Sequence, residues 1–164
     1  MTNKEFFIKV INAEAPIFEK VVKALPEDKL DFKVHEKART AGRIAFQLAS
    51  QPSFIAAIAM EGEPDWGTYR EPSNPNLEEI LALMKKNFAD LKKKLAKVSD
   101  EEWDDAEAVL KFPGGEWKTK KYDMAWGFLF DAIHHRGQLS TYLRAMGAKV
   151  PSIYGGSADE KPSV

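Results

Sequence analysis

The sequence predicts an all-α protein, a four-helix bundle with a crossover connection. Four long segments repeat apolar residues every three or four positions, which is the spacing of one helical face. Little of the remaining chain is typical of strand, so packing of helix against helix is favoured. Hydrophobic residues make up 44% and charged residues 30% of the 164 residues, as in a single globular domain. Because two connections are long, we expect at least one to be a crossover.

The first two helices are expected over residues 3–25 and 41–60. Pro16 interrupts the first, and a proline removes one backbone hydrogen bond of a helix. We therefore expect one kinked helix there, with two shorter helices as the alternative. Thr40 is an expected N-cap for the second helix, and Pro52 within it is a candidate bend.

The last two long helices are expected over residues 77–98 and 122–146. Asn76 is a suitable N-cap for the first of them, which has the most regular apolar stripe in the chain. Gly147 is well placed to end the second. Three connecting segments are also predicted: an irregular run at 61–76, a capped helical turn at 99–103 and a turn at 112–117 that is typical of a small hairpin.

We divide the chain into a bundle at residues 1–150 and a C-terminal tail at 151–164. The 24 Lys and Arg residues nearly balance 25 Asp and Glu residues, which disfavours binding to nucleic acid through phosphate contacts. The absence of cysteine excludes disulfides, thiolate metal sites and a cysteine nucleophile. No apolar run approaches the roughly 20 residues that span a bilayer, and the first residues lack a signal-peptide pattern. We expect no membrane partner and a cytoplasmic location.

The candidate chemistry lies on the last long helix. Asp131 and His135 are four residues apart, so their side chains lie on the same face. They could chelate a divalent ion, or they could form an ion pair that fixes the tautomer of His135. Gln47 lies on or beside the apolar face of the second helix. It could be a weak oxygen ligand, a hydrogen-bond partner of Asp131 or His135, or a polar residue at the edge of the stripe.

Further residues are candidates for the surroundings of this site. Glu14 interrupts the apolar stripe of the first helix and could reach the same pocket, pair with a base or extend to solvent. His134 and Arg136 are offset by about 100° per residue from the pair, so we expect them to support the site or a dimer contact. Gln138 and Tyr142 could orient a ligand.

The run His134-His135-Arg136-Gly137-Gln138, followed by Val-Pro-Ser-Ile-Tyr-Gly at 150–155, strongly resembles the DinB-like (DinB/YfiT) family. Residues 40–49 resemble the second helix of that family, and the resemblance covers nearly the whole chain. It implies a four-helix bundle that is commonly a homodimer, with an apolar dimer surface on the first and last long helices. The family name refers to damage-inducible expression and does not imply DNA binding.

The resemblance also implies a divalent-metal site, typically nickel or zinc, made of three histidines. The corresponding residues here are Gln47, Asp131 and His135. Two of the three imidazoles are replaced, so this set should bind zinc or nickel more weakly and could favour another ion or none. Glu14 or water could complete the shell.

By resemblance, the implied function is that of a metal-dependent transferase that uses a small-molecule thiol against an electrophile, or of a hydrolase. The alternative is a non-catalytic small-molecule-binding or dimeric scaffold protein that has lost its metal. In that case Asp131 and His135 would form a structural ion pair bridged by Gln47. In both cases we expect the three side chains to converge in a pocket inside the bundle.

Overall fold

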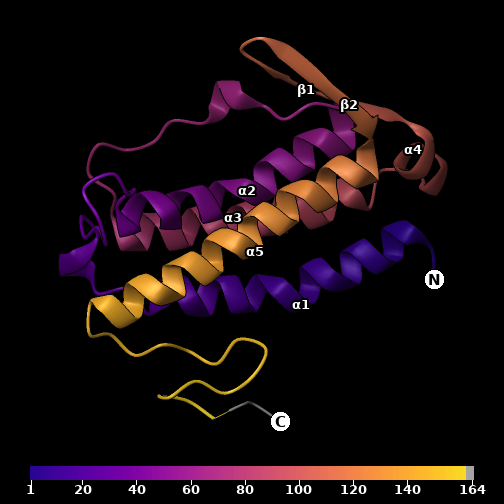
Figure 1. Cartoon of the computed structure of the whole chain (residues 1–164). Coiled ribbons are helices and arrows are strands. Elements are labelled where there is room, and N and C mark those ends of the chain that lie inside the picture. Colours follow the sequence, from indigo (N-terminus) through magenta and orange to yellow (C-terminus); the bar gives the residue numbers. More distant parts are fainter. Residues whose placement is uncertain (162–164) are drawn as a thin grey trace.

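The bundle is seen in a computed structural model that describes residues 1–161, and of Thr68 the backbone alone. Residues 162–164 of the predicted tail lie outside the described residues. The long helices lie side by side (Figure 1) and confirm the predicted all-α fold class. Helices α1 and α2 each contact both α3 and α5. Their bounds are α1 (Asn3–Lys23), α2 (Ala41–Glu61), α3 (Leu77–Leu95) and α5 (Lys121–Ala145).

Three of these helices are preceded by a residue whose side chain caps the N-terminus of the helix. The side chain of Thr2 accepts a hydrogen bond from the third backbone N–H of α1, and Thr40 and Asn76 do the same for α2 and α3. Pro16 and Pro52 lie inside α1 and α2 without dividing them. The prediction of one helix over the first segment is therefore confirmed.

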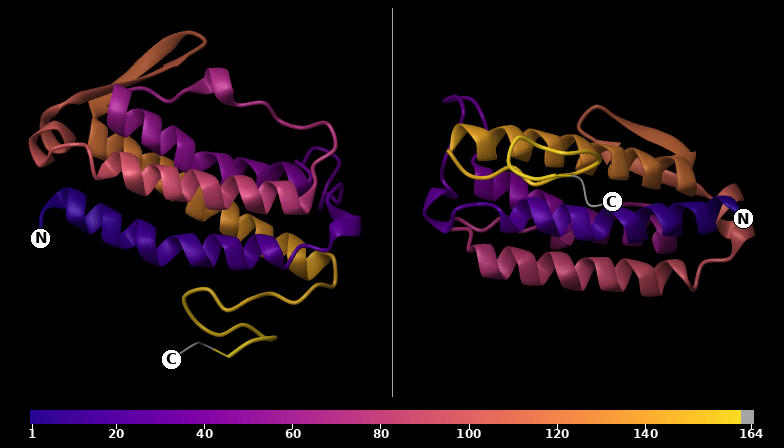
Figure 2. Two further views of the ribbon diagram at one scale, coloured as in Figure 1. Left: turned by 180° about the vertical axis from the view of Figure 1, so that it is seen from behind. Right: turned by 90° about the horizontal axis from the view of Figure 1, so that it is seen from below.

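The crossover is the connection at residues 62–76. It runs back along the length of the bundle (Figures 1 and 2), so that α2 and α3 point in the same direction. It contains a short 3₁₀ turn, η2 (Trp66–Thr68), and a second one, η1 (Glu27–Lys29), lies between α1 and α2. The rings of Trp66 and Tyr69 lie 4.6 and 5.7 Å from the ring of Phe54 on α2. These contacts fix the crossover to one flank of the bundle.

The segment between α3 and α5 contains the short helix α4 (Asp100–Asp105) and a hairpin. Strands β1 (Glu107–Phe112) and β2 (Gly115–Lys120) pair antiparallel, which confirms the predicted hairpin. Gly114 in its turn has a φ of 94°, a conformation that favours glycine. The hairpin projects from the end of the bundle where α2 ends and α5 begins (Figure 1).

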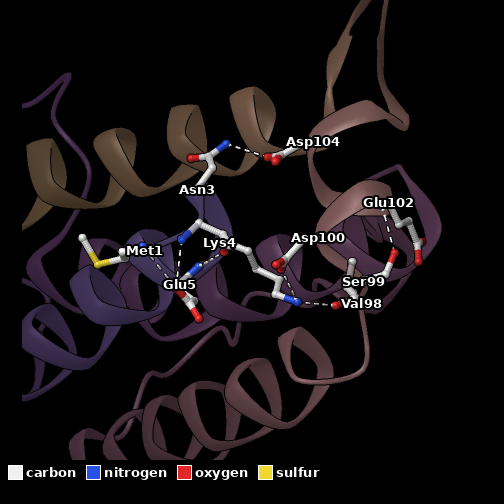
Figure 3. A network of polar contacts seen from close by, with 10 residues as sticks. Met1, Asn3, Lys4, Glu5, Val98, Ser99, Asp100, Glu102 and Asp104 are labelled. Carbon is white, nitrogen blue, oxygen red and sulfur yellow. Dashed lines mark hydrogen bonds and ion pairs between the residues drawn. The ribbon is translucent and has the colours of Figure 1, made fainter.

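Polar contacts hold the start of α1 against α4 (Figure 3). Asn3 donates to the carboxylate of Asp104 at 2.9 Å. The ammonium of Lys4 donates to the carbonyl oxygen of Val98 and pairs with Asp100, both at 2.7 Å. Beneath these contacts Trp103 of α4 is fully buried, so α4 closes this end of the core.

A buried ion pair lies where the C-terminal segment covers α1 and α5. The guanidinium of Arg136 donates to Glu14, and the hydroxyl of Tyr154 accepts from Arg136 at 2.6 Å and donates to Glu14 at 2.8 Å. Of the three alternatives for Glu14, the structure shows pairing with a base. Arg136 is buried in this pair instead of lying at an exposed dimer surface. Two exposed ion pairs hold the same segment: Lys20–Glu160 and Arg144–Asp159.

None of the described helices is long and apolar enough to cross a membrane.

Candidate functional site

A pocket of about 420 Å³ opens on the flank of the bundle between α2 and α5. The crossover and the hairpin form its outer walls. Its aromatic lining comes from four different elements, and Arg39, Gln47, Gln51 and Asp131 provide its polar side chains. The aromatic residues are Phe54, Trp66, Tyr69, Trp117 and Phe128.

Four of the aromatic rings form one connected wall: those of Phe54, Trp66, Tyr69 and Phe128. The ring of Trp66 lies 4.6 Å from that of Phe54 and 6.1 Å from that of Phe128. On the hairpin side, Trp117 covers Gly127 of α5, where an added Cβ would lie 3.7 Å from the indole ring. Trp66 and Trp117 both remain exposed. Large exposed rings around a concave site are typical of binding surfaces.

The carboxylate of Asp131 is held in place by two amides of α2. Its Oδ2 atom accepts hydrogen bonds from Gln51 Nε2 at 2.6 Å and from Gln47 Nε2 at 3.3 Å. Gln51 is buried, and its amide also donates to the carbonyl oxygen of Phe128 at 3.4 Å. Gln47 and Gln51 lie one turn apart, so both reach the same carboxylate from one face of α2.

The second oxygen of Asp131 faces His135. Its Oδ1 atom lies 3.5 Å from Nε2 of the imidazole, and Nδ1 lies 3.0 Å from the amide oxygen of Gln138. Because an amide oxygen only accepts, Nδ1 carries the proton in this contact. Nε2 is therefore the ring nitrogen that faces Asp131.

Arg39 places a positive charge at the edge of the pocket. Its guanidinium donates to the amide oxygen of Gln47, whose nitrogen donates in turn to Asp131. A hydrogen bond to the oxygen of an amide polarises the amide and strengthens the hydrogen bond that its nitrogen donates. Arg39 therefore supports the contact between Gln47 and Asp131. Burial and then Glu71 raise the pKa of Tyr69, while Arg39 opposes that rise.

The structure brings Gln47, Asp131 and His135 together, as the spacing argument requires. Gln47 and Asp131 line an open pocket on the flank of the bundle and not in its interior, since the Asp131 side chain is 48% exposed, and His135 contacts Asp131 without lining the pocket. Glu14 lies with Arg136 instead and does not line this pocket.

The other predicted residues surround the site at different depths. His134 is exposed, with its ring centroid 5.2 Å from that of His135. The buried Tyr142 donates its hydroxyl to the carbonyl oxygen of Arg39 at 2.9 Å, and burial raises its pKa. Tyr142 thus fixes the chain at Arg39, and Gln138 fixes the ring of His135.

Sequence reasoning missed Gln51, Arg39 and the aromatic wall. A signal for Gln51 was present, since it follows Gln47 by one helical turn. No local pattern indicated that Trp66 and Trp117 would line the same pocket, because one is in the crossover and the other in the hairpin.

The donor set does not fit a metal site of the three-histidine kind. In the part of the chain that the structure describes, no group of three or more His, Asp or Glu side chains is placed to hold a metal ion. Oδ2 of Asp131 already accepts hydrogen bonds from two side-chain amides, and the amide oxygen of Gln47 faces Arg39. A guanidinium next to the amide ligand would also repel a divalent cation.

Comparisons with known proteins give a family and a fold. The model of the DinB family matches residues 1–162. A DinB-like protein from Bacillus cereus is 20% identical, with a TM-score of 0.72 over 92% of this chain and 97% of that one. A DinB-like protein from Bacillus subtilis is 17% identical, with a TM-score of 0.69 over 89% and 96%.

A mycothiol-dependent maleylpyruvate isomerase is also similar in structure. It is 12% identical, with a TM-score of 0.54 over 93% of this chain and 68% of that one. At this identity the likeness shows a shared fold alone. No curated protein matches the chain.

Proposed function

The chain belongs to the DinB family, and from the geometry of its pocket we propose that it binds a small organic molecule between α2 and α5. The observation that carries this proposal is the Asp131 carboxylate, which two amides hold at one end of an open aromatic pocket. The apolar part of the ligand would contact the rings, and a polar group would bond to Asp131.

The dimensions and rigidity of the pocket support this proposal. Its volume of about 420 Å³ lies within the roughly 300–1,000 Å³ of small-molecule sites. Asp131 is already oriented, so binding would cost little side-chain entropy at the polar contact. Metal-dependent chemistry does not enter this proposal because the donor set at the site does not fit an ion.

The proposed pocket can be closed by substituting Gly127. An added Cβ there lies at an ordinary contact distance of 3.7 Å from Trp117, so Gly127→Ala should leave the pocket open. Gly127→Leu should extend a larger side chain into it. Both variants replace a helix-interior glycine by a better helix former, so both should fold.

The test is a ligand-observed NMR screen of small aromatic and aliphatic fragments against the full chain and these two variants. We expect fragments that bind the original chain to bind Gly127→Ala and to be lost from Gly127→Leu. The proposal fails if Gly127→Leu binds the same fragments equally well, or if no fragment binds the original chain at millimolar concentration.

The second candidate function is a metal-dependent transferase that uses a small-molecule thiol against an electrophile, or a hydrolase. The observation that favours it is the closeness of two donor atoms, His135 Nε2 and Asp131 Oδ1, at 3.5 Å. It requires Gln47 to turn its amide oxygen away from Arg39, so it is the less well supported of the two. Titration with zinc and nickel, described below, distinguishes them.

We also infer that two copies of the chain associate through an aromatic patch made of Phe6, Trp126 and Phe130. The Phe130 side chain is 61% exposed, and its ring stacks on Trp126 at 5.6 Å. Phe6 of α1 lies 5.9 Å from the same indole. These residues lie on α1 and α5, the two helices on which the family resemblance implies a dimer surface. The absence of cysteine from the chain supports a cytoplasmic location.

A further inference from the structure

Resting on the proposed function, we propose further that the pocket selects a small organic cation, an alkylated ammonium, with its positive centre at Asp131. Two features of the described residues carry this proposal. The charge of Asp131 is bonded to neutral donors, and the walls next to it are aromatic.

The first feature is the charge balance at Asp131. In the described part of the chain its one basic partner is His135, whose Nε2 lies 3.5 Å away. At 3.5 Å this contact is longer than an ordinary N–H···O hydrogen bond of about 2.7–3.2 Å. The amides of Gln47 and Gln51 orient the carboxylate without balancing its charge. A cationic ligand would supply the missing counter-charge.

The second feature is the wall of rings. The faces of aromatic rings carry partial negative charge and attract cations, and tryptophan does so most strongly. Trp66 and Trp117 both line this pocket and are exposed to an incoming ligand. An aromatic wall combined with a carboxylate is the chemistry that recognises quaternary ammonium groups.

Arg39 provides the competing chemistry. Its guanidinium could attract an anion to the same pocket, and it repels a cation, a divalent ion about twice as strongly as a singly charged ammonium. It is already bonded to the amide oxygen of Gln47, and that amide separates it from Asp131. An anion at Arg39 would also meet repulsion from the carboxylate, so we expect anions to bind less tightly than neutral molecules of the same shape.

The experiment uses three probes that share a branched, tert-butyl-like head and differ in charge. They are choline, the neutral 3,3-dimethylbutan-1-ol and the anion 3,3-dimethylbutanoate. Each is titrated into the full chain while the indole N–H signals of Trp66 and Trp117 are followed by NMR. The buried Trp103 serves as the internal reference. We expect choline to bind about tenfold more tightly than the neutral alcohol, and the anion to bind more weakly than either.

Two aspartate variants on α5 test the role of the charge. Asp131→Asn keeps the shape and should remove the tenfold preference, bringing the affinity for choline down to that for the alcohol. Asp123→Asn is the matched control, because this exposed carboxylate bonds to Thr119 outside the pocket. As an independent readout, Trp66→Leu should weaken choline binding more than alcohol binding.

The outcomes separate this inference from the proposed function. Equal affinity for choline and the alcohol would overturn the cation preference and leave small-molecule binding intact. Tighter binding of the anion would overturn it in favour of Arg39 as the anchor. An unchanged preference in Asp131→Asn would also overturn it. If none of the three probes shifts the Trp66 and Trp117 signals while fragments bind in the Gly127-dependent way, the cation preference alone fails.

Discussion

Glu14→Gln should be one of the most destabilising conservative substitutions in this chain. The Arg136 side chain is 1% exposed and that of Glu14 is 9% exposed, so the pair is shielded from water. The substitution removes the negative charge and leaves a buried guanidinium without its counter-ion. Removing one partner of a buried ion pair costs about 3–5 kcal/mol.

The surroundings of Arg136 offer little compensation for that loss. The guanidinium lies over the rings of Phe18 and Tyr154, at 4.6 and 5.0 Å from their centroids. Its Nε atom is buried with no hydrogen-bond partner among the described residues. The Tyr154 hydroxyl and the single amide oxygen left at position 14 are neutral acceptors that do not replace the lost charge, so most of this cost should be seen as a loss of unfolding free energy.

Urea unfolding followed by circular dichroism measures this change. The m-value should stay constant, because the same surface is exposed on unfolding. Glu19→Gln is the control, since Glu19 pairs with Lys23 in an exposed i,i+4 contact at 2.5 Å on the same helix. That pair is worth about 0.3–0.5 kcal/mol. If Glu14→Gln lowered the unfolding free energy no more than Glu19→Gln does, the buried Glu14–Arg136 pair and the covering of α1 and α5 by the C-terminal segment would be refuted.

Three further predictions concern the tail, the aromatic patch and the pocket. The hydrogen bond from Arg144 lowers the pKa of Asp159 below its ordinary 3.8. The contact between these two side chains is therefore fully formed above pH 3.8 and is lost as the pH falls through the lowered pKa. The protection factor of the Val150 amide, whose N–H donates to the same carboxylate at 2.9 Å, should then fall, and a constant protection factor down to pH 2 would contradict this. Phe130→Ser should convert the proposed dimer to a monomer in analytical ultracentrifugation, and an unchanged sedimentation coefficient would contradict the proposed interface. Gly127→Ala should stabilise α5 by up to about 1 kcal/mol in urea unfolding, and a loss of stability would show that Trp117 packs more tightly there than the 3.7 Å distance indicates.

The local features of this fold could be predicted because local chemistry determines them. Thr40 and Asn76 cap the helices that follow them, and the turn at Gly114 closes the predicted hairpin. The pairing of Asp131 with His135 follows from the helical repeat alone.

The remaining features depend on contacts between distant parts of the chain. Glu14 and Arg136 are 122 residues apart, so no local pattern could choose among the three alternatives for Glu14. The aromatic wall exists because a long crossover returns Trp66 to α2 and the hairpin places Trp117 over α5. Both arrangements depend on tertiary packing rather than on periodicity.

The proposed function requires that Asp131 contact a ligand directly instead of holding a metal ion. Calorimetric titration with zinc and nickel tests it, with the chain compared to a Gln47→His/Asp131→His double variant that restores three imidazoles. We predict that the double variant binds zinc at least about 100-fold more tightly than the original chain, since losing even a hydrogen-bonding partner of a ligand costs about 10–100-fold. Stoichiometric zinc or nickel binding by the original chain at comparable affinity, abolished by Asp131→Asn, would contradict the claim.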